Sequence, residues 1–299
     1  MSRLTALGAA LCLVAGCVGT GRVAPVSSSA QLEPEATVEL GSPAVGICRD
    51  GDGLLVLENS GTRVVRYGFR NPALGTDSGR REPVLGTVPV RGQSPFALAA
   101  LDTLPLTERV TAPAGVTADR FYIYVHDDHV LYRMSKEKLT LQAWLGNVRV
   151  AGLASFESGM MLVSDGDRGA IWYKGLFGES RQFISGAEVA RPGAMVALPD
   201  GAFAVVSASS MLVYFNRSGV VLRSVPLPTG CDLLAGDETD ELCIGQRGQP
   251  LVWVLKGNRL TGYRLSDSVS PLSFAVVGGS LAVLDAGTRI RVYRMPEAE

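Results

Sequence analysis

The chain has two histidines, and both lie in one short acidic segment. His126 and His129 flank Asp127 and Asp128, so imidazole and carboxylate groups occur side by side. Imidazole nitrogens with carboxylate oxygens can bind Zn²⁺ or Mn²⁺, and carboxylate oxygens alone can bind Ca²⁺. This segment is the sharpest indication of a metal site in the sequence.

Five other polar segments are expected to lie at the same level of the fold, because each also follows the second apolar run of a repeating unit. Four of the six segments carry carboxylates, and the other five are Glu58-Asn59, Asp165-Gly166-Asp167, Ser207-Ala208-Ser209, Gly245-Gln246-Arg247 and Asp285-Ala286. Two interpretations remain open. The first is a ligand or Ca²⁺ site around a channel mouth, formed by Glu58, Asn59, His126, Asp127, His129, Asp165, Asp167 and Asp285. The second and stronger one is a set of ordinary turns, since Asp, Asn, Ser and Gly favour tight turns; no cofactor is therefore expected.

Motifs of nucleophilic or metal-dependent catalysis are absent from the sequence. There is no Gly-x-Ser-x-Gly, no His-Glu-x-x-His, no glycine-rich phosphate loop and no Cys-x-x-Cys. A Ser-His-Asp arrangement would have to be built around His126 or His129. We therefore predict no catalytic residue and favour a protein that is not an enzyme.

The elements that would position these segments repeat along the chain. Tyr132, Tyr173, Tyr214, Trp253 and Tyr293 follow one another at intervals of 41, 41, 39 and 40 residues, and Tyr67 precedes Tyr132 by 65. Each aromatic closes a similar apolar run: VVRY, HVLY, AIWY, MLVY, PLVW and IRVY. A period of this length in strand-like sequence predicts an all-β, six-bladed β-propeller. We expect the aromatic side chains to pack between neighbouring sheets.

The last repeat lacks an outer strand, because the chain stops just after its third apolar run. Residues 36–40 have strand character and no local partner, so we predict that they complete the last blade and close the ring. Closure would remove the exposed edges of an open array. The excess between Tyr67 and Tyr132 is assigned to an insertion at residues 93–112, as a long loop, a capping strand or a short helix.

The first residues read as a targeting segment. Arg3 precedes an apolar stretch, Leu4 to Val14, that is too short to span a bilayer. The run Leu13-Val14-Ala15-Gly16-Cys17 resembles a bacterial lipobox, which implies a signal peptide at residues 1–16 and lipidation of Cys17. The alternative is an ordinary signal peptide with an incidental cysteine. Residues 17–35 have few large apolar side chains, so we expect a lipidated flexible tether that precedes a propeller domain at residues 36–299.

Composition limits the partners. The net charge is −1 and there is no block of Lys or Arg, so nucleic acid and anionic bilayer surfaces are not expected partners. Cys48, Cys231 and Cys243 are an odd number in an oxidising compartment, so at least one thiol stays unpaired. We expect free, buried cysteines.

The repeat pattern resembles the NHL-type six-bladed propellers, which include bacterial lipoproteins, over almost the whole mature chain. It departs from WD-repeat proteins, since no Trp-Asp or Gly-His pair recurs. The resemblance implies a monomeric, lipid-anchored binding or scaffold module for a protein or peptide in the bacterial cell envelope. Val18 after the lipobox cysteine resembles an outer-membrane sorting signal, so the domain would face the periplasm or the cell surface. The alternative is a metal-dependent hydrolase or lyase similar to gluconolactonase-type propellers, with its site at the channel mouth.

Overall fold

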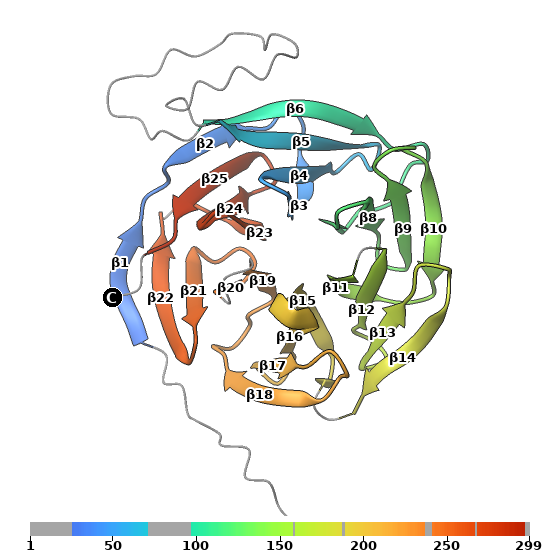
Figure 1. The fold of residues 1–299 in the computed structure, drawn as a ribbon. Helices are drawn as coiled ribbons and strands as arrows, with labels where there is room; N and C mark the ends of the chain where they lie inside the picture. The colour runs from blue at the N-terminus through green and yellow to red at the C-terminus, as the bar shows by residue number, and fades with distance from the viewer. Residues whose placement is uncertain are drawn as a thin grey trace, which may run out of the picture.

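The fold is a ring of β-sheets around a central axis (Figure 1). The computed structural model describes residues 26–70, 97–157, 159–186, 189–236, 241–266 and 268–296. Within these residues there are six sheets, five with four strands and one with five. The predicted six-bladed propeller is confirmed.

Each blade is an antiparallel meander whose first strand lies nearest the axis. Blade one contains β3 (Ala44–Asp50), β4 (Gly53–Glu58), β5 (Arg63–Arg70) and β6 (Ala97–Pro105), and blade two contains β7 (Gly115–Ala118), β8 (Tyr122–His126), β9 (Val130–Ser135) and β10 (Leu141–Gly146). Blade three contains β11 (Val150–Glu157), β12 (Met160–Asp165), β13 (Ala170–Lys174) and β14 (Ser180–Ser185). Blade four contains β15 (Pro192–Ala197), β16 (Phe203–Ser207), β17 (Met211–Phe215) and β18 (Val221–Pro226), with the 3-10 turn η2 (Pro199–Gly201) after β15.

The last two blades include the N-terminal strands. Blade five contains β19 (Leu233–Gly236), β20 (Leu242–Gly245), β21 (Leu251–Lys256) and β22 (Arg259–Leu265), with β1 (Val26–Leu32) as a fifth strand. Blade six contains β23 (Pro271–Val277), β24 (Ser280–Asp285), β25 (Arg289–Arg294) and β2 (Ala36–Glu39). Strands β4, β16 and β24 are buried along their whole length, which explains why their sequences are almost continuously apolar.

The ring is closed as predicted, by a strand from the beginning of the chain on the last blade. Strand β2 pairs antiparallel with β25, from Ala36 opposite Val292 to Glu39 opposite Arg289. Val38 and Leu40 pack against the buried cluster of blades six and one. Blade six therefore contains strands from both the N-terminal and the C-terminal parts of the chain. Loss of the pairing between β2 and β25 would open the ring.

The flexible tether predicted for residues 17–35 is wrong over its C-terminal half. Strand β1 pairs in parallel with β22, with Val26 opposite Thr261 and Leu32 opposite Leu265. The pairing uses main-chain groups at the otherwise open edge of blade five, so it does not need the apolar side chains that sequence reasoning looked for. Residues 1–25, with the signal peptide at 1–16 and the lipidation site Cys17, lie outside the described residues.

The insertion predicted at residues 93–112 is also corrected. Ala97–Pro105 is strand β6, the ordinary outer strand of blade one, and it pairs with β5 along its length. In blades two to five a short turn joins the third and fourth strands, whereas here residues 71–96 stand between them. Because β6 is so far from β5 in the sequence, it could not be recognised there as the fourth strand of blade one. The extra residues therefore fall at 71–96, outside the part of the chain that the structure describes.

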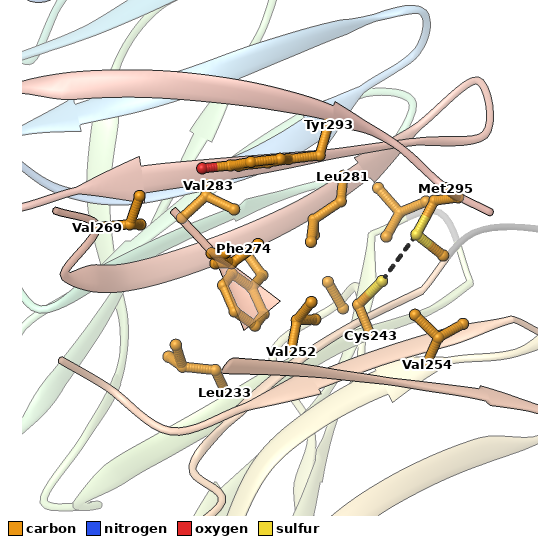
Figure 2. Packing of buried hydrophobic residues seen from close by; sticks show 13 residues of the cluster. Leu233, Cys243, Val252, Val254, Val269, Phe274, Leu281, Val283, Tyr293 and Met295 are labelled. Atoms are coloured by element: carbon orange, nitrogen blue, oxygen red, sulfur yellow. Dashed lines mark hydrogen bonds between the residues drawn. The ribbon is translucent and has the colours of Figure 1, made fainter. Parts of the chain in front are cut away.

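The repeating aromatic residues are part of the core, as expected. All six lie on third strands and belong to, or pack against, buried clusters between blades. Figure 2 shows one such cluster between blades five and six, where Tyr293 lies beside Val283 and Leu281. In the same cluster the Sγ of Cys243 lies 3.2 Å from the Sδ of Met295.

None of the three cysteines within the described residues forms a disulfide, as expected. Cys243 is buried, but Cys48 and Cys231 are only partly buried, which corrects the expectation for those two. Burial raises the pKa of the Cys231 thiol to about 11, and Asp232 adds to the rise. Among the described residues there is no apolar helix of membrane-spanning length.

Candidate functional site

The first strands of the blades enclose a central channel. Its volume is about 1190 Å³, and its wall is formed by β3, β7, β11, β15, β19 and β23; five of these strands are labelled around the centre of Figure 1. Glycines let neighbouring strands approach closely. A Cβ on Gly152 would lie 2.4 Å from the carbonyl oxygen of Gly193 on the next blade. The close approach is possible because neither position carries a side chain.

The channel has an uncharged wall and charged ends. We call face A the end where loops join second strands to third strands, and face B the end where turns join first strands to second strands and third strands to fourth strands. Asp128, Arg149, Asp232 and Arg247 line the channel at face A, and Arg49, Asp50, Asp119, Arg120 and Lys136 line it at face B. A ligand inside would contact mostly small apolar side chains, and its charged groups would be placed at the two mouths.

The predicted rim segments lie together on face A. Strand pairing places the last residue of each second strand opposite the start of the first strand of the same blade, as with Glu58 and Ala44, or Asp165 and Val150. Glu58, His126, Asp165, Ser207 and Asp285 are buried at this level. The sequence thus placed these segments correctly, and their hydrogen bonds show what the side chains do.

Two of the aspartates hold their own turns. The Oδ1 of Asp127 accepts hydrogen bonds from the backbone N–H groups of His129 and Val130, at 2.8 and 2.7 Å. The Oδ1 of Asp165 accepts from the N–H groups of Asp167 and Arg168, at 3.2 and 3.1 Å. This is the turn chemistry of aspartate, and it occupies oxygens that a metal would need.

Glu58 and Asp285, which are also buried, are paired with arginine. Asp285 is 0% exposed, and its Oδ2 accepts a hydrogen bond from the Nε of Arg291 at 2.8 Å. Its Oδ1 accepts from the backbone N–H of Ser270 at 2.8 Å. Glu58 pairs with Arg63. Both carboxylates therefore link the end of a second strand to the third strand of the same blade.

The remaining predicted ligands do not converge. Asn59, Asp167 and His129 are exposed, and Asp167 pairs with Arg149 at 2.8 Å. Within the described ranges, no group of three His, Cys, Asp or Glu side chains is close enough together to hold a metal ion. The blades separate the six segments, so sharing a face does not bring the side chains within reach of one ion.

Among the predicted rim residues, His126 is the one whose side chain a molecule in the channel could contact. Its Nδ1 lies 3.0 Å from the carbonyl oxygen of Asp127, which fixes the proton on Nδ1 and leaves a lone pair on Nε2. A Cβ at position 115 would lie 2.4 Å from this Nε2, so the nitrogen faces the channel wall where Gly115 has no side chain. The imidazole can therefore accept a hydrogen bond or a proton from a molecule in the channel.

Burial makes this histidine a source of pH dependence. Burial lowers the pKa of His126 below its ordinary 6.5, and the Asp127 carbonyl and the charges of Asp127 and Asp128 oppose the shift without cancelling it. In the unfolded chain His126 binds a proton more readily, so protonation favours unfolding. The stability linked to neutral His126 is fully present above pH 6.5 and is lost as the pH falls below it.

We expect His126→Gln to reduce this loss of stability. The measurement is the free energy of unfolding in urea at pH 7.5, 6.5 and 5.5, where one proton contributes a slope of at most about 1.4 kcal/mol per pH unit. His129→Gln is the matched control, since His129 is exposed in the same loop. Equal pH profiles for His126→Gln and the unsubstituted protein would contradict the assignment.

Sequence reasoning missed the charged residues that line the channel at face A. Arg149 and Asp232 come directly before Val150 and Leu233, the first residues of innermost strands. A search of the positions just before each first strand would have found both. The sequence prediction considered only the segments that follow the second strands.

Comparisons with known proteins give the fold. No protein-family model matches the chain, and no curated protein matches it. Among solved structures, virginiamycin B lyase from Staphylococcus aureus is 12% identical with a TM-score of 0.59, covering 87% of this chain and 99% of its own. The WD40 β-propeller domain of Doa1 is 12% identical with a TM-score of 0.61, covering 89% of this chain and 97% of its own. At this identity the likeness establishes a propeller that resembles a lyase and a WD40 domain, and it assigns no activity.

Proposed function

We propose that this chain is a lipid-anchored binding module of the bacterial cell envelope whose partner is a protein or a peptide. The proposal includes an NHL-like propeller, an acylated Cys17 in the outer membrane, a monomeric domain and no bound cofactor. The rim carboxylates support it, because they are engaged in turns and ion pairs and so offer little to a metal-dependent reaction.

The observation that carries the proposal is a set of three exposed apolar side chains on face B. Phe121 of blade two, Phe177 of blade three and Val220 of blade four all lie in turns or loops of this face, and Phe177 is 92% exposed. They belong to three consecutive blades. Exposed apolar side chains that cluster on one face mark interaction surfaces, because contact with a partner removes them from water. Large aromatic residues contribute most where proteins bind one another.

The loop that carries Phe177 is held in place by the neighbouring blade. The guanidinium of Arg133 in blade two donates a hydrogen bond to the carbonyl oxygen of Leu176, at 3.2 Å, next to Phe177. The same guanidinium stacks on the rings of Tyr122 and Trp144, 4.7 and 4.6 Å from their centroids. A loop fixed in this way loses little conformational entropy on binding.

A photoreactive phenylalanine analogue at position 177 tests this proposal. We expect ultraviolet irradiation of intact cells to give a discrete crosslinked protein or peptide adduct. The matched control places the analogue at Leu251, which is also exposed but lies at the face A end of β21. If position 177 gives no adduct beyond that seen from position 251, the proposal fails and a purely structural envelope protein becomes the better hypothesis.

A second candidate, a lyase, rests on His126. One of the similar solved structures is a catalytically inactive histidine-to-alanine variant of virginiamycin B lyase with quinupristin, 12% identical with a TM-score of 0.59. In this chain the neutral imidazole of His126 faces the channel and could accept a proton there. Incubation of the protein with quinupristin and a divalent cation tests whether it has lyase activity on that substrate. A lyase would consume quinupristin and lose the activity on His126→Ala, with His129→Ala as the control.

A further inference from the structure

Strand β1 lies on an edge of blade five that the blade does not need for its own completion. Strands β19 to β22 already form a four-stranded meander like those of the other blades, and β1 is added outside β22 (Figure 1). The other N-terminal strand, β2, differs because it is the fourth strand of blade six. The edge of β22 is therefore a place that accepts an extended segment in addition to a complete blade.

The pairing of β1 with β22 is parallel and interrupted. Its register shifts between Ser27 and Gln31, where four steps along β1 face the two steps from Gly262 to Arg264. The pairing of β2 with β25 is antiparallel and continuous over four residues. Parallel pairing is slightly less stable per residue, and a register shift disrupts the ladder locally. The main chain therefore holds β1 more weakly than β2.

Leu32 gives β1 an apolar contact with the core. Leu32 and Tyr263 both pack against the buried cluster between blades five and six, and Leu265, which lies opposite Leu32, belongs to that cluster. Residues 27–31 are three serines, an alanine and a glutamine, and Gln31 is exposed. The edge therefore offers an apolar site, which Leu32 fills, beside a stretch that takes small or polar residues.

We infer that the edge of β22 binds an extended segment of the peptide partner, which pairs in parallel in place of β1 and puts an apolar side chain where Leu32 lies. This inference rests on the proposed function and specifies how part of the partner is held. Strand β1 carries it, because an extended segment seated on this edge shows the chemistry that fits there: main-chain pairing, small polar residues and a leucine at the end. Addition of a peptide strand to the edge of a sheet is a recurring mode of peptide recognition.

Strand β1 then acts as an autoinhibitory strand. It can leave the edge without opening the ring, because β2, and not β1, completes blade six. Segments held by few contacts open locally while the rest of a domain stays folded. Only residues 33–35 separate β1 from β2, so the released strand stays at a high effective concentration beside its site and excludes weaker ligands.

Hydrogen exchange of the full-length protein tests the opening of β1. We expect the amides of β1 to exchange about tenfold or more faster than those of β2, since β1 opens without the rest of the domain. Equal protection of the two strands would show that they open together, and it would overturn the inference. This measurement needs no substituted protein.

Fluorescence anisotropy with a synthetic peptide tests the edge itself. The probe is a fluorescein-labelled peptide with the sequence of residues 26–32, and its control peptide has aspartate in place of the leucine. In the full-length protein, Leu32→Asp puts a charge against the buried cluster and should release β1. We expect this variant to bind the probe about tenfold or more tightly than the unsubstituted protein, whose own strand competes for the edge.

The matched control is Gln31→Asp, which adds the same charge to the same strand at an exposed position. We expect it to bind the probe as weakly as the unsubstituted protein does. The inference is overturned if Leu32→Asp does not bind the probe at millimolar concentration, if both variants bind it equally, or if the control peptide binds as tightly as the probe. Dimers of the unsubstituted protein that Leu32→Asp abolishes also overturn it, because the occupant would then be β1 of a second copy.

Failure of this inference and failure of the proposed function give different results. If the probe does not bind Leu32→Asp but position 177 gives an adduct in cells, the edge assignment is wrong and the binding function stands. If the probe binds as expected and position 177 gives no adduct, face B is not the binding surface. The proposed function is then wrong, while the edge of β22 remains a peptide site.

Discussion

Replacing Asp285 by asparagine is expected to lower the free energy of unfolding by about 3 to 5 kcal/mol, the range for breaking a buried ion pair by removing one partner. Asp285 is fully buried and binds Arg291 at 2.8 Å and Arg289 at 3.3 Å. Asparagine keeps the shape of the side chain but removes its charge. Arg291, itself largely buried, would be left without a counter-charge.

The position of Asp285 in the ring adds to this effect. Its second oxygen holds the backbone N–H of Ser270, just before the first strand of the last blade. One carboxylate therefore links the second strand, the third strand and the connection that enters blade six. Loosening it weakens the blade that both chain ends must complete.

Urea denaturation at neutral pH measures the change. Asp167→Asn is the matched control, because it removes a carboxylate of the same face whose pair with Arg149 is exposed, with Asp167 61% exposed. Exposed pairs contribute little to stability, so its midpoint should stay close to that of the unsubstituted protein. Equal loss in the two variants would show that Asp285 has no special structural role.

Removing strand β2 is expected to destabilise the domain by about 3 kcal/mol or more, since main-chain hydrogen bonds at about 1 kcal/mol each and apolar burial are both lost. A chain that begins at residue 41 lacks both β1 and the outer strand of blade six, together with the side chains of Val38 and Leu40, which pack on the cluster with Ile290 and Val292. It would also expose the edge of β25 and aggregate.

The control is a chain that begins at residue 33, which lacks β1 but keeps β2. Strand β1 is a fifth strand on an already complete blade, so its loss should cost less stability than the loss of β2. Thermal unfolding and size-exclusion chromatography of the two truncated proteins compare the effects. Because both truncated proteins lack β1, the difference between them measures the contribution of β2. If the chain that begins at residue 41 is as stable as the chain that begins at residue 33, the ring is not held by its N-terminal closure.

Much of the fold could be predicted from the sequence because its determinants are local. Asp and Gly at the tips of short hairpins, with apolar runs between them, indicate strand, turn and strand within each repeat. The regular return of Tyr132, Tyr173 and Tyr214 counts the blades. The missing last strand then identified residues 36–40 as its replacement, and β2 confirms this.

The pairing of β1 with β22 and of β6 with β5 could not be predicted in the same way. Strand β1 is a serine-rich segment that is held by main-chain contacts with β22, more than two hundred residues later in the chain. Strand β6 is separated from its partner β5 by residues 71–96, so no hairpin signal marks it. In both cases the partner, and not the segment itself, determines the structure.

The sequence by itself determined the number of blades, the closure of the ring and the face on which the polar segments lie, because hairpin geometry and strand alternation are encoded within each repeat. Only the tertiary structure decided what those polar groups do. Asp127 and Asp165 hold turns, Asp285 neutralises a buried arginine, and His126 reaches the channel past Gly115. Such roles depend on partners that lie far apart in the sequence and that only tertiary packing brings together. The sequence of a single repeat does not show which partners these are.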